Sequence, residues 1–143
     1  MPELNTALLM FIAQRHAEAR VIEHLRAHGF DDITMAQGRI GARISEDGMR
    51  LTDLAAAAQV TKQTAAFLVG QLERAGYVER RPDPTDARAR LICIADRGRA
   101  VQQEARVVEQ QVEAEWARHL GAERMAALRE SLLDLREITD PWA

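Results

Sequence analysis

Two short helical segments joined by a tight break and followed by a strand-turn-strand pattern constrain this chain more than any other feature. The segment TDLAAAAQ begins at Thr52, which is predicted to be the N-cap of the first helix. Thr61 is the predicted N-cap of the second, KQTAAFLVGQLERA, and Gly76 is its expected stop. Two helices joined in this way form the helix-turn-helix pattern.

The second helix has one face for the core and one for solvent. Its apolar stripe, which is predicted to be buried, consists of Ala65, Leu68, Val69, Leu72 and Ala75. Its other face carries Lys62, Gln63, Ala66, Phe67 and Gly70. Apart from Lys62, that outward face is uncharged.

The strand-turn-strand pattern predicts a β-hairpin directly after these helices. Tyr77–Arg81 and Arg90–Ile94 are the expected strands, and the eight residues between them, PDPTDARA, supply the Pro and Asp of a turn. Strand alternation sends Ile92 and Ile94 to one face, and Leu91 and Cys93 to the other. Four arginines surround the turn: Arg80, Arg81, Arg88 and Arg90.

Amphipathic helices are predicted on both sides of this unit. Leu4–His28 places apolar residues at helical spacing and ends at Gly29, and residues 101–116 and 125–138 carry two further apolar stripes. Such stripes at the chain ends need a partner surface, which a two-fold dimer supplies by burying the same patch on both chains.

The predicted fold is therefore α+β and mostly α-helical: a winged helix-turn-helix with long N- and C-terminal dimerisation helices. We expect one continuous domain, with dimerisation helices at 1–33 and 97–143 and the winged lobe at 34–96. Within that lobe Thr34 is expected to cap a further helix, and Met49–Leu51 is long enough only for one edge strand.

Charge and composition narrow the function classes. The 143-residue chain has a formal net charge of −3, but residues 61–90 hold six basic and only four acidic side chains. One cysteine, Cys93, excludes an internal disulfide. Without an apolar run of about 18 residues or a signal peptide, we expect a cytoplasmic protein with no membrane partner.

The winged helix-turn-helix explains where the arginines are needed. A helix fits the major groove of duplex DNA, and a hairpin beside it reaches phosphates or the minor groove. An arginine at the hairpin tip, for which Arg88 is the main candidate, can enter a narrow minor groove and read its shape. Asp86 lies two residues earlier, close enough to brace an arginine by a charge-assisted hydrogen bond.

Residues 34–98 resemble the MarR (multiple antibiotic resistance regulator) family. The run is TMAQ and then RLTDLAAAAQVTKQTAAFLVGQLERAGYVERRPDPTDARARLICIADRG. Its most specific element is Asp86-x-Arg88 followed by an apolar strand and Gly98, with Leu72-Glu73 and Gly76 ahead of it. The flanking helices agree with the family only in their pattern.

The resemblance implies a homodimeric, cytoplasmic transcription regulator that binds double-stranded DNA, and a repressor is the expected role. It also implies that a small anionic or aromatic effector relieves binding, and it implies no cofactor. The side chains expected to contact DNA are Thr61, Lys62, Gln63, Thr64, Phe67, Arg81, Asp86, Arg88 and Arg90. Two recognition helices of such a dimer face successive major grooves about 34–36 Å apart, so the operator should be pseudo-palindromic.

The sequence departs from the family pattern at two places. Ala66 and Phe67 stand where family members often have Thr and then Arg or Lys, so two usual polar contacts are missing. Phe67 is left to contact a thymine methyl group. Ile94-Ala95 replaces the usual Leu-Thr at the end of the second strand, so the helix cap there is expected to be Asp96.

Other sites have weaker support. Phe11, Arg15, Met35 and Arg39 are candidates for an effector cavity, with dimer core and surface charge as the alternative reading. His24 and His28, four residues apart, have a spacing that can hold a metal, but no further ligand is evident and no metal site is predicted. Cys93 has no nearby histidine or second cysteine and is expected to be a spectator.

Two other function classes are open to a chain of this kind. No Ser/His/Asp set, glycine-rich phosphate loop or paired carboxylates are present, so catalysis is not expected. A winged helix that serves as a protein interaction module is the alternative, favoured by the acidic total charge and by the apolar pair at 66 and 67.

Overall fold

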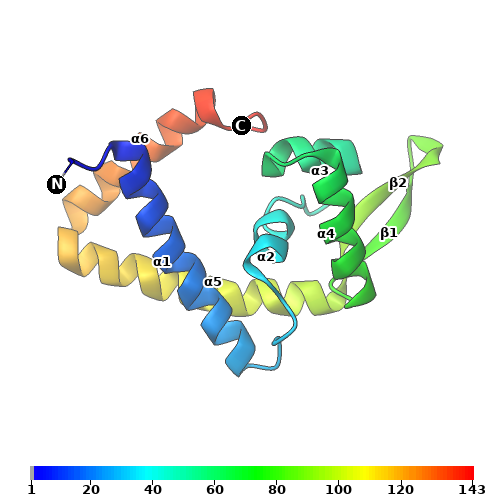
Figure 1. The fold of residues 1–143 in the computed structure, drawn as a ribbon, viewed down its shortest axis with the longest axis horizontal. Helices are drawn as coiled ribbons and strands as arrows, with labels where there is room; N and C mark the ends of the chain where they lie inside the picture. The colour runs from blue at the N-terminus through cyan, green and yellow to red at the C-terminus, as the bar shows by residue number, and fades with distance from the viewer. Residues whose placement is uncertain (1) are drawn as a thin grey trace.

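The computed structural model describes residues 2–143, which form six α-helices and one two-stranded antiparallel sheet (Figure 1). In chain order these are α1 (Thr6–Ala27), α2 (Met35–Gly41), α3 (Leu51–Ala58), α4 (Lys62–Arg74), β1 (Val78–Asp83), β2 (Asp86–Ile94), α5 (Asp96–Leu120) and α6 (Ala122–Thr139). The arrangement confirms the predicted fold class: α3 and α4 are the helix-turn-helix, and the β1–β2 hairpin is the wing.

Capping side chains set two of the three helix starts in the winged lobe, which is the unit from α2 to β2. Thr34 and Gln37 form a reciprocal capping box at α2, with N···O distances of 3.2 and 3.1 Å. The Thr61 hydroxyl accepts from the amide of Thr64 at 3.0 Å and caps α4 as predicted.

The predicted cap of α3 was wrong. The N-cap is Arg50, without a side-chain hydrogen bond, and Thr52 already lies inside the helix. The reason is the residue before it: Met49 pairs with Ile92 through two backbone hydrogen bonds, so the chain enters the helix directly from that bridge. The expected edge strand at Met49–Leu51 is reduced to this single bridge.

The wing turn is much tighter than the expected eight residues. β1 pairs with β2 from Val78↔Ile94 to Asp83↔Asp86, with an irregularity at Pro82/Asp83, so only two residues connect the strands. The Asp83 carboxylate accepts hydrogen bonds from the amide and hydroxyl of Thr85, at 2.8 and 2.7 Å, and so closes the turn early. Arg88 therefore lies on a strand near the tip and not in a loop.

The expected alternation of the second strand holds only in part. Ile92 is buried on the face toward the lobe core, but Cys93 on the opposite face is buried as well. The loop at Gly48 covers it: a β-carbon added there would lie 2.6 Å from the Cys93 sulfur. Gly48 also has φ +84°, a conformation that favours glycine.

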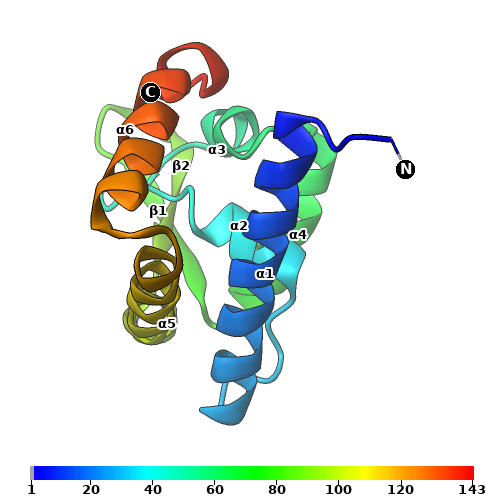
Figure 2. The ribbon, with the colours of Figure 1, turned by 90° about the vertical axis from the view of Figure 1, so that its left-hand side faces the viewer.

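The lobe has its own apolar core. Its most buried members come from every helix of the lobe and from both strands: Ile40, Leu54, Ala65, Val69, Leu72, Val78 and Ile92. The stripe predicted on α4 is the part that faces this core, with Ala75 only half-buried. Ile22 and Leu25 of α1 join the same cluster, and α1 lies beside α2 (Figure 2).

A close contact joins α5 to the wing. Gly98 is buried in the first turn of α5, and a β-carbon there would collide with the carbonyl oxygen of Tyr77. The N-cap is Ala95, whose amide donates to that same carbonyl at 3.0 Å. The prediction that Asp96 would be the cap was wrong. Asp96 is the first helical residue, and its carboxylate pairs with Arg99.

The two chain ends leave a large apolar area uncovered. No residue of α6 is buried, and the first half of α1 is exposed. We call this the terminal apolar surface, and its large side chains are Leu4, Leu8, Leu9, Met10, Phe11, Ile12, Leu128, Leu132, Leu133, Leu135 and Ile138. Among the described residues, no helix is both long and apolar enough to span a bilayer.

The end of α6 returns to the lobe. The Asp140 carboxylate pairs with Arg43, after α2, at 2.7 Å, and the Gln59 amide donates to the carbonyl of Thr139 at 3.3 Å. Figure 1 shows the C-terminus beside α3. The end of α6 thus contacts the lobe in addition to α1, which contributes to its core, and α5, which packs against the wing.

Candidate nucleic-acid interface

The N-terminal end of α4 presents the predicted polar group to solvent. Thr61, Lys62, Gln63 and Thr64 are exposed, and the Thr61 hydroxyl donates to that of Thr64 at 2.9 Å. Phe67 follows on the same outward face with 63% of its area exposed, although it is a large aromatic side chain. The start of α4 therefore offers hydroxyl, amide and ammonium groups beside one exposed ring.

The four arginines around the wing differ in what they contact. Arg80 pairs with Glu73 of α4 at 3.2 Å, and Arg81 pairs with Glu79 on its own strand. Arg88 is 96% exposed, and its nearest acidic contact, with Asp86, is 3.9 Å long. Arg90 is also exposed. The side chains with the most freedom to meet a ligand are therefore Arg88 and Arg90.

Asp86 acts mainly on the backbone. Its carboxylate accepts from the amide of Arg88 at 3.0 Å, and so fixes the strand that carries the arginine more than it holds the guanidinium. Figures 1 and 2 both place the wing tip and the start of α4 toward the same end of the lobe.

Sequence reasoning missed the ion pair that anchors the base of the wing tip. Arg50, the N-cap of α3, contacts Asp83 at 2.8 Å and also approaches Asp86 at 3.9 Å. Hydrogen bonds from Thr85, and then from Arg50, lower the pKa of Asp83 to about 2. The signal that could have revealed the turn is the Asp-Pro-Thr run, because an Asp side chain readily bonds the backbone two residues on.

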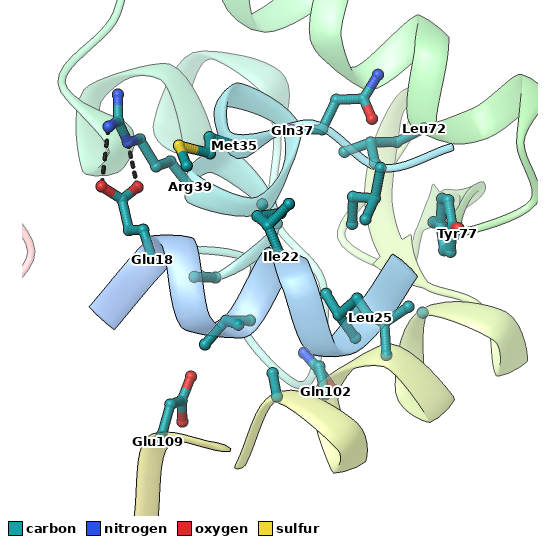
Figure 3. Close-up of a pocket in the computed structure, with 18 of the residues that line it drawn as sticks. Glu18, Ile22, Leu25, Met35, Gln37, Arg39, Leu72, Tyr77, Gln102 and Glu109 are labelled. Carbon is teal, nitrogen blue, oxygen red and sulfur yellow. Dashed lines mark hydrogen bonds and ion pairs between the residues drawn. The ribbon is translucent and has the colours of Figure 1, made fainter. Parts of the chain in front are cut away.

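A cavity of about 380 Å³ lies where α1, α2 and α5 meet below the lobe (Figure 3). Of the four predicted effector residues, Met35 and Arg39 line it, Arg15 lies beside it with its guanidinium 3.1 Å from the Met35 sulfur, and Phe11 is not part of its wall. Phe11 lies three residues before Gln14, the first lining residue of α1, and belongs to the terminal apolar surface.

The charge of Arg39 is already balanced. Its guanidinium donates to both carboxylate oxygens of Glu18, at 2.5 and 2.9 Å, as Figure 3 shows. The hydrogen bond from Arg39 lowers the pKa of Glu18. Most of the remaining wall is apolar, with Ile22, Leu25 and Leu72 among the lining side chains.

A second group of polar side chains joins α1 to α5. His24 and His28 of α1 lie beside Glu104 of α5, with one ligand atom of each within 4.8 Å of the others. The histidine spacing was visible in the sequence, but Glu104 was not recognised because it lies 80 residues from His24.

Sequence comparison bears on the lobe that carries the candidate interface. Residues 31–89 match the model of the MarR family. The matched segment covers most of the winged lobe, which therefore resembles regulators of the MarR family. A curated protein similar to this chain, the transcriptional activatory protein BadR of Rhodopseudomonas palustris, is 40% identical over 55 residues. That alignment covers 38% of this chain and only 31% of BadR.

Solved structures extend the likeness in fold to nearly the whole chain. MarR from E. coli superposes with a TM-score of 0.72 at 23% identity, covering 94% of this chain and 98% of that one. A point mutant of S. aureus MepR, solved bound to an oligodeoxyribonucleotide, gives a TM-score of 0.60 at 22% identity, with coverage of 94% and 98%.

Proposed function

We propose that this chain is a regulator of the MarR family, which binds duplex DNA as a homodimer and represses transcription at a pseudo-palindromic operator. The observation that carries the proposal is the pairing of an exposed, mostly neutral recognition face on α4 with an adjacent wing whose Arg88 is 96% exposed. An arginine in that position suits insertion into a minor groove, and Thr61 to Thr64 suit the major groove. MepR, which has the same fold, was solved with DNA.

The terminal apolar surface supports the homodimer. Exposed leucines on α1 and α6 form an apolar area of a kind that monomeric proteins rarely leave in contact with water. In a two-fold dimer the same patch is buried on both chains. Dimerisation then sets the distance between the two α4 helices, and therefore the spacing of the operator half-sites.

An effector is the finer part of the proposal. The cavity between α1, α2 and α5 is of a size that holds a small molecule, and its wall is mostly apolar. Because the Arg39 guanidinium already pairs with the Glu18 carboxylate, the cavity favours an aromatic or apolar molecule over a small anion. Such a ligand releases DNA only if it binds a lobe arrangement unsuited to the operator more tightly.

The proposal is tested by fluorescence-anisotropy titration with the DNA upstream of the chain's own gene, at two salt concentrations and with unrelated duplex as competitor. We expect binding that survives the competitor and weakens steeply with salt, because several phosphate contacts release counterions. Arg88→Ala should cost about 1–3 kcal/mol of binding free energy.

The matched control is Arg124→Ala, which removes an exposed arginine at the start of α6, far along the chain from the wing. If Arg88→Ala binds as tightly as the parent at the same salt, the wing does not contact DNA. If the parent shows no preference over unrelated duplex at either salt, the exposed Ala66 and Phe67 favour a protein interaction module instead.

A further inference from the structure

The structure places two histidines and a carboxylate together where α1 crosses α5. The imidazole rings of His24 and His28 are stacked, with centroids 3.9 Å apart and planes inclined by 23°. Glu104 approaches them from α5, with its Oε2 2.7 Å from Nε2 of His24. This cluster lies outside both the candidate DNA interface and the lining of the cavity.

The hydrogen bonds of the two histidines orient their rings for coordination. Nδ1 of His28 lies 2.7 Å from the carbonyl oxygen of His24, and because a carbonyl only accepts, Nδ1 carries the proton. In the neutral ring this leaves the Nε2 lone pair of His28 free. Histidines that bind metals typically donate their other N–H to a backbone carbonyl in this way, which fixes both tautomer and orientation.

The ligand set indicates which ions would fit. Two imidazoles and one carboxylate suit divalent ions of the zinc class, whereas an all-oxygen set would suit magnesium or calcium. Two ligand atoms on one tetrahedral zinc are ~3.4 Å apart when each bond is ~2.1 Å. The three groups, now within 4.8 Å of one another, need only small side-chain rotations to reach that geometry.

We propose that His24, His28 and Glu104 form a binding site for one divalent transition-metal ion, with zinc as the ion of choice. On binding, the ion replaces the hydrogen bond between His24 and Glu104, and the proton of the neutral His24 ring moves through solvent from Nε2 to Nδ1, which leaves the Nε2 lone pair for the ion. The side chains of His24 and Glu104 are 21% and 38% exposed, so water can complete the coordination.

The bound ion would link α1 to α5 next to the cavity. Leu25 and Ala105, the neighbours in sequence of His24 and Glu104, both line that cavity. The ion would therefore fix the crossing of the two helices at the edge of the space proposed for an effector. Metal binding itself does not depend on DNA binding, so the site can be tested separately from the proposed function.

The first experiment titrates Zn²⁺ into the untagged full chain in competition with a chromophoric chelator, and repeats the titration with Co²⁺ to record its visible absorption. We expect one equivalent per chain and the intense Co²⁺ bands of a tetrahedral site. His28→Gln and Glu104→Gln should each lower the affinity at least about tenfold, since even outer-shell partners of metal ligands contribute that much.

The chain supplies matched controls, because its other two histidines lie outside the cluster. His16→Gln and His119→Gln remove exposed imidazoles from α1 and α5 and should leave the affinity unchanged. Circular dichroism of each variant checks that the helices remain. Zinc should also raise the thermal midpoint of the parent chain but not that of His28→Gln, since an ion that binds only the folded state stabilises it.

Four results would overturn the proposal. The parent chain could bind no zinc, or a control variant could lose as much affinity as His28→Gln. The third is a Glu104→Gln chain with parental affinity, which would reduce the site to a histidine pair on α1 and remove the link to α5. The fourth is an octahedral Co²⁺ spectrum with parental zinc affinity in all variants, which would show only nonspecific surface binding.

Discussion

The winged lobe and the terminal helices solve the problem of burying apolar side chains in different ways. In the lobe Leu54, Val69 and Ile92 are almost completely buried by groups of the same chain. In α6 every residue is at least partly exposed, although Leu128, Leu132 and Leu135 follow one face at helical spacing. One region is complete within a single chain, whereas the other needs a second copy to cover it.

The largest expected effect is a loss of stability in the core of the lobe. Leu54→Ala removes a side chain with no exposed area and should lower the free energy of unfolding by about 2–5 kcal/mol, because a cavity is left in a packed core. Leu133→Ala is the matched control in α6, where the side chain is half exposed. Urea unfolding of both variants at one protein concentration measures the difference; equal losses would mean that a partner chain packs on Leu133 as tightly as the lobe core packs on Leu54.

The second prediction concerns the terminal helices, where a substitution should weaken dimerisation and leave the lobe folded. Leu132→Glu places a charge on the terminal apolar surface and should weaken dimerisation by at least about 2 kcal/mol, roughly thirtyfold in the dissociation constant. Sedimentation velocity over a range of concentrations reports the shift to monomer. Glu137→Lys, on the opposite side of α6 by helical spacing, is the control, and an unchanged Leu132→Glu dimer would place the interface elsewhere.

A third, pH-dependent effect concerns the wing. The pKa of Asp83, held at about 2 by Thr85 and Arg50, lies below its ordinary value. Its ionised form therefore stabilises the fold above about pH 4, and this contribution is lost as the pH falls toward 2. Asp83→Asn should lower stability at pH 7 and lose less on acidification.

Urea unfolding of the parent and of Asp83→Asn, at pH 7 and again near pH 3, measures that difference. Asp47→Asn, in an exposed loop, controls for the change in net charge. If the difference in stability between the parent and Asp83→Asn were the same at pH 7 and near pH 3, Asp83 would not supply the acid sensitivity of the wing.

The smallest expected effect lies at the junction of the two regions. Hydrogen bonds from Arg43, Arg136 and the Trp142 amide lower the pKa of Asp140. Asp140→Asn should free the last turn of α6, with little change in global stability because the ion pair holds only the end of that helix to the lobe. Hydrogen exchange of the amides near Arg136 should quicken, and unchanged exchange would show that this contact does not hold α6 to the lobe.

The sequence predicts most of the lobe because its signals are local. The hydroxyl groups of Thr34 and Thr61 accept the hydrogen bonds that cap their helices, and the apolar stripe on α4 repeats at helical spacing. A short stretch of sequence is therefore enough to predict each of these features. The predictions fail where a residue distant in sequence determines the local structure. Arg50 begins α3 because Met49 pairs with Ile92, and Cys93 is buried because the Gly48 loop covers it.

The candidate sites follow the same rule. Strand alternation and the turn residues lead to Arg88, but nothing local shows that Arg80 and Arg81 are paired while Arg88 is exposed. The cavity depends on how α1 packs against α5, which the sequence of either helix leaves open. Phe11 and Arg15 were candidates for that cavity before the crossing point of α1 was known, and Glu104 could not be placed beside His24 without the fold.

The lobe is held to the terminal helices at three places. These are the α1 side chains Ile22 and Leu25 in its core, the contact between Tyr77 and Gly98, and the ion pair between Arg43 and Asp140. A rigid body held at two points can still turn about the line that joins them, whereas a third point off that line removes this rotation. A change in the separation of two α4 helices in a dimer therefore requires that at least one of these three contacts rearranges.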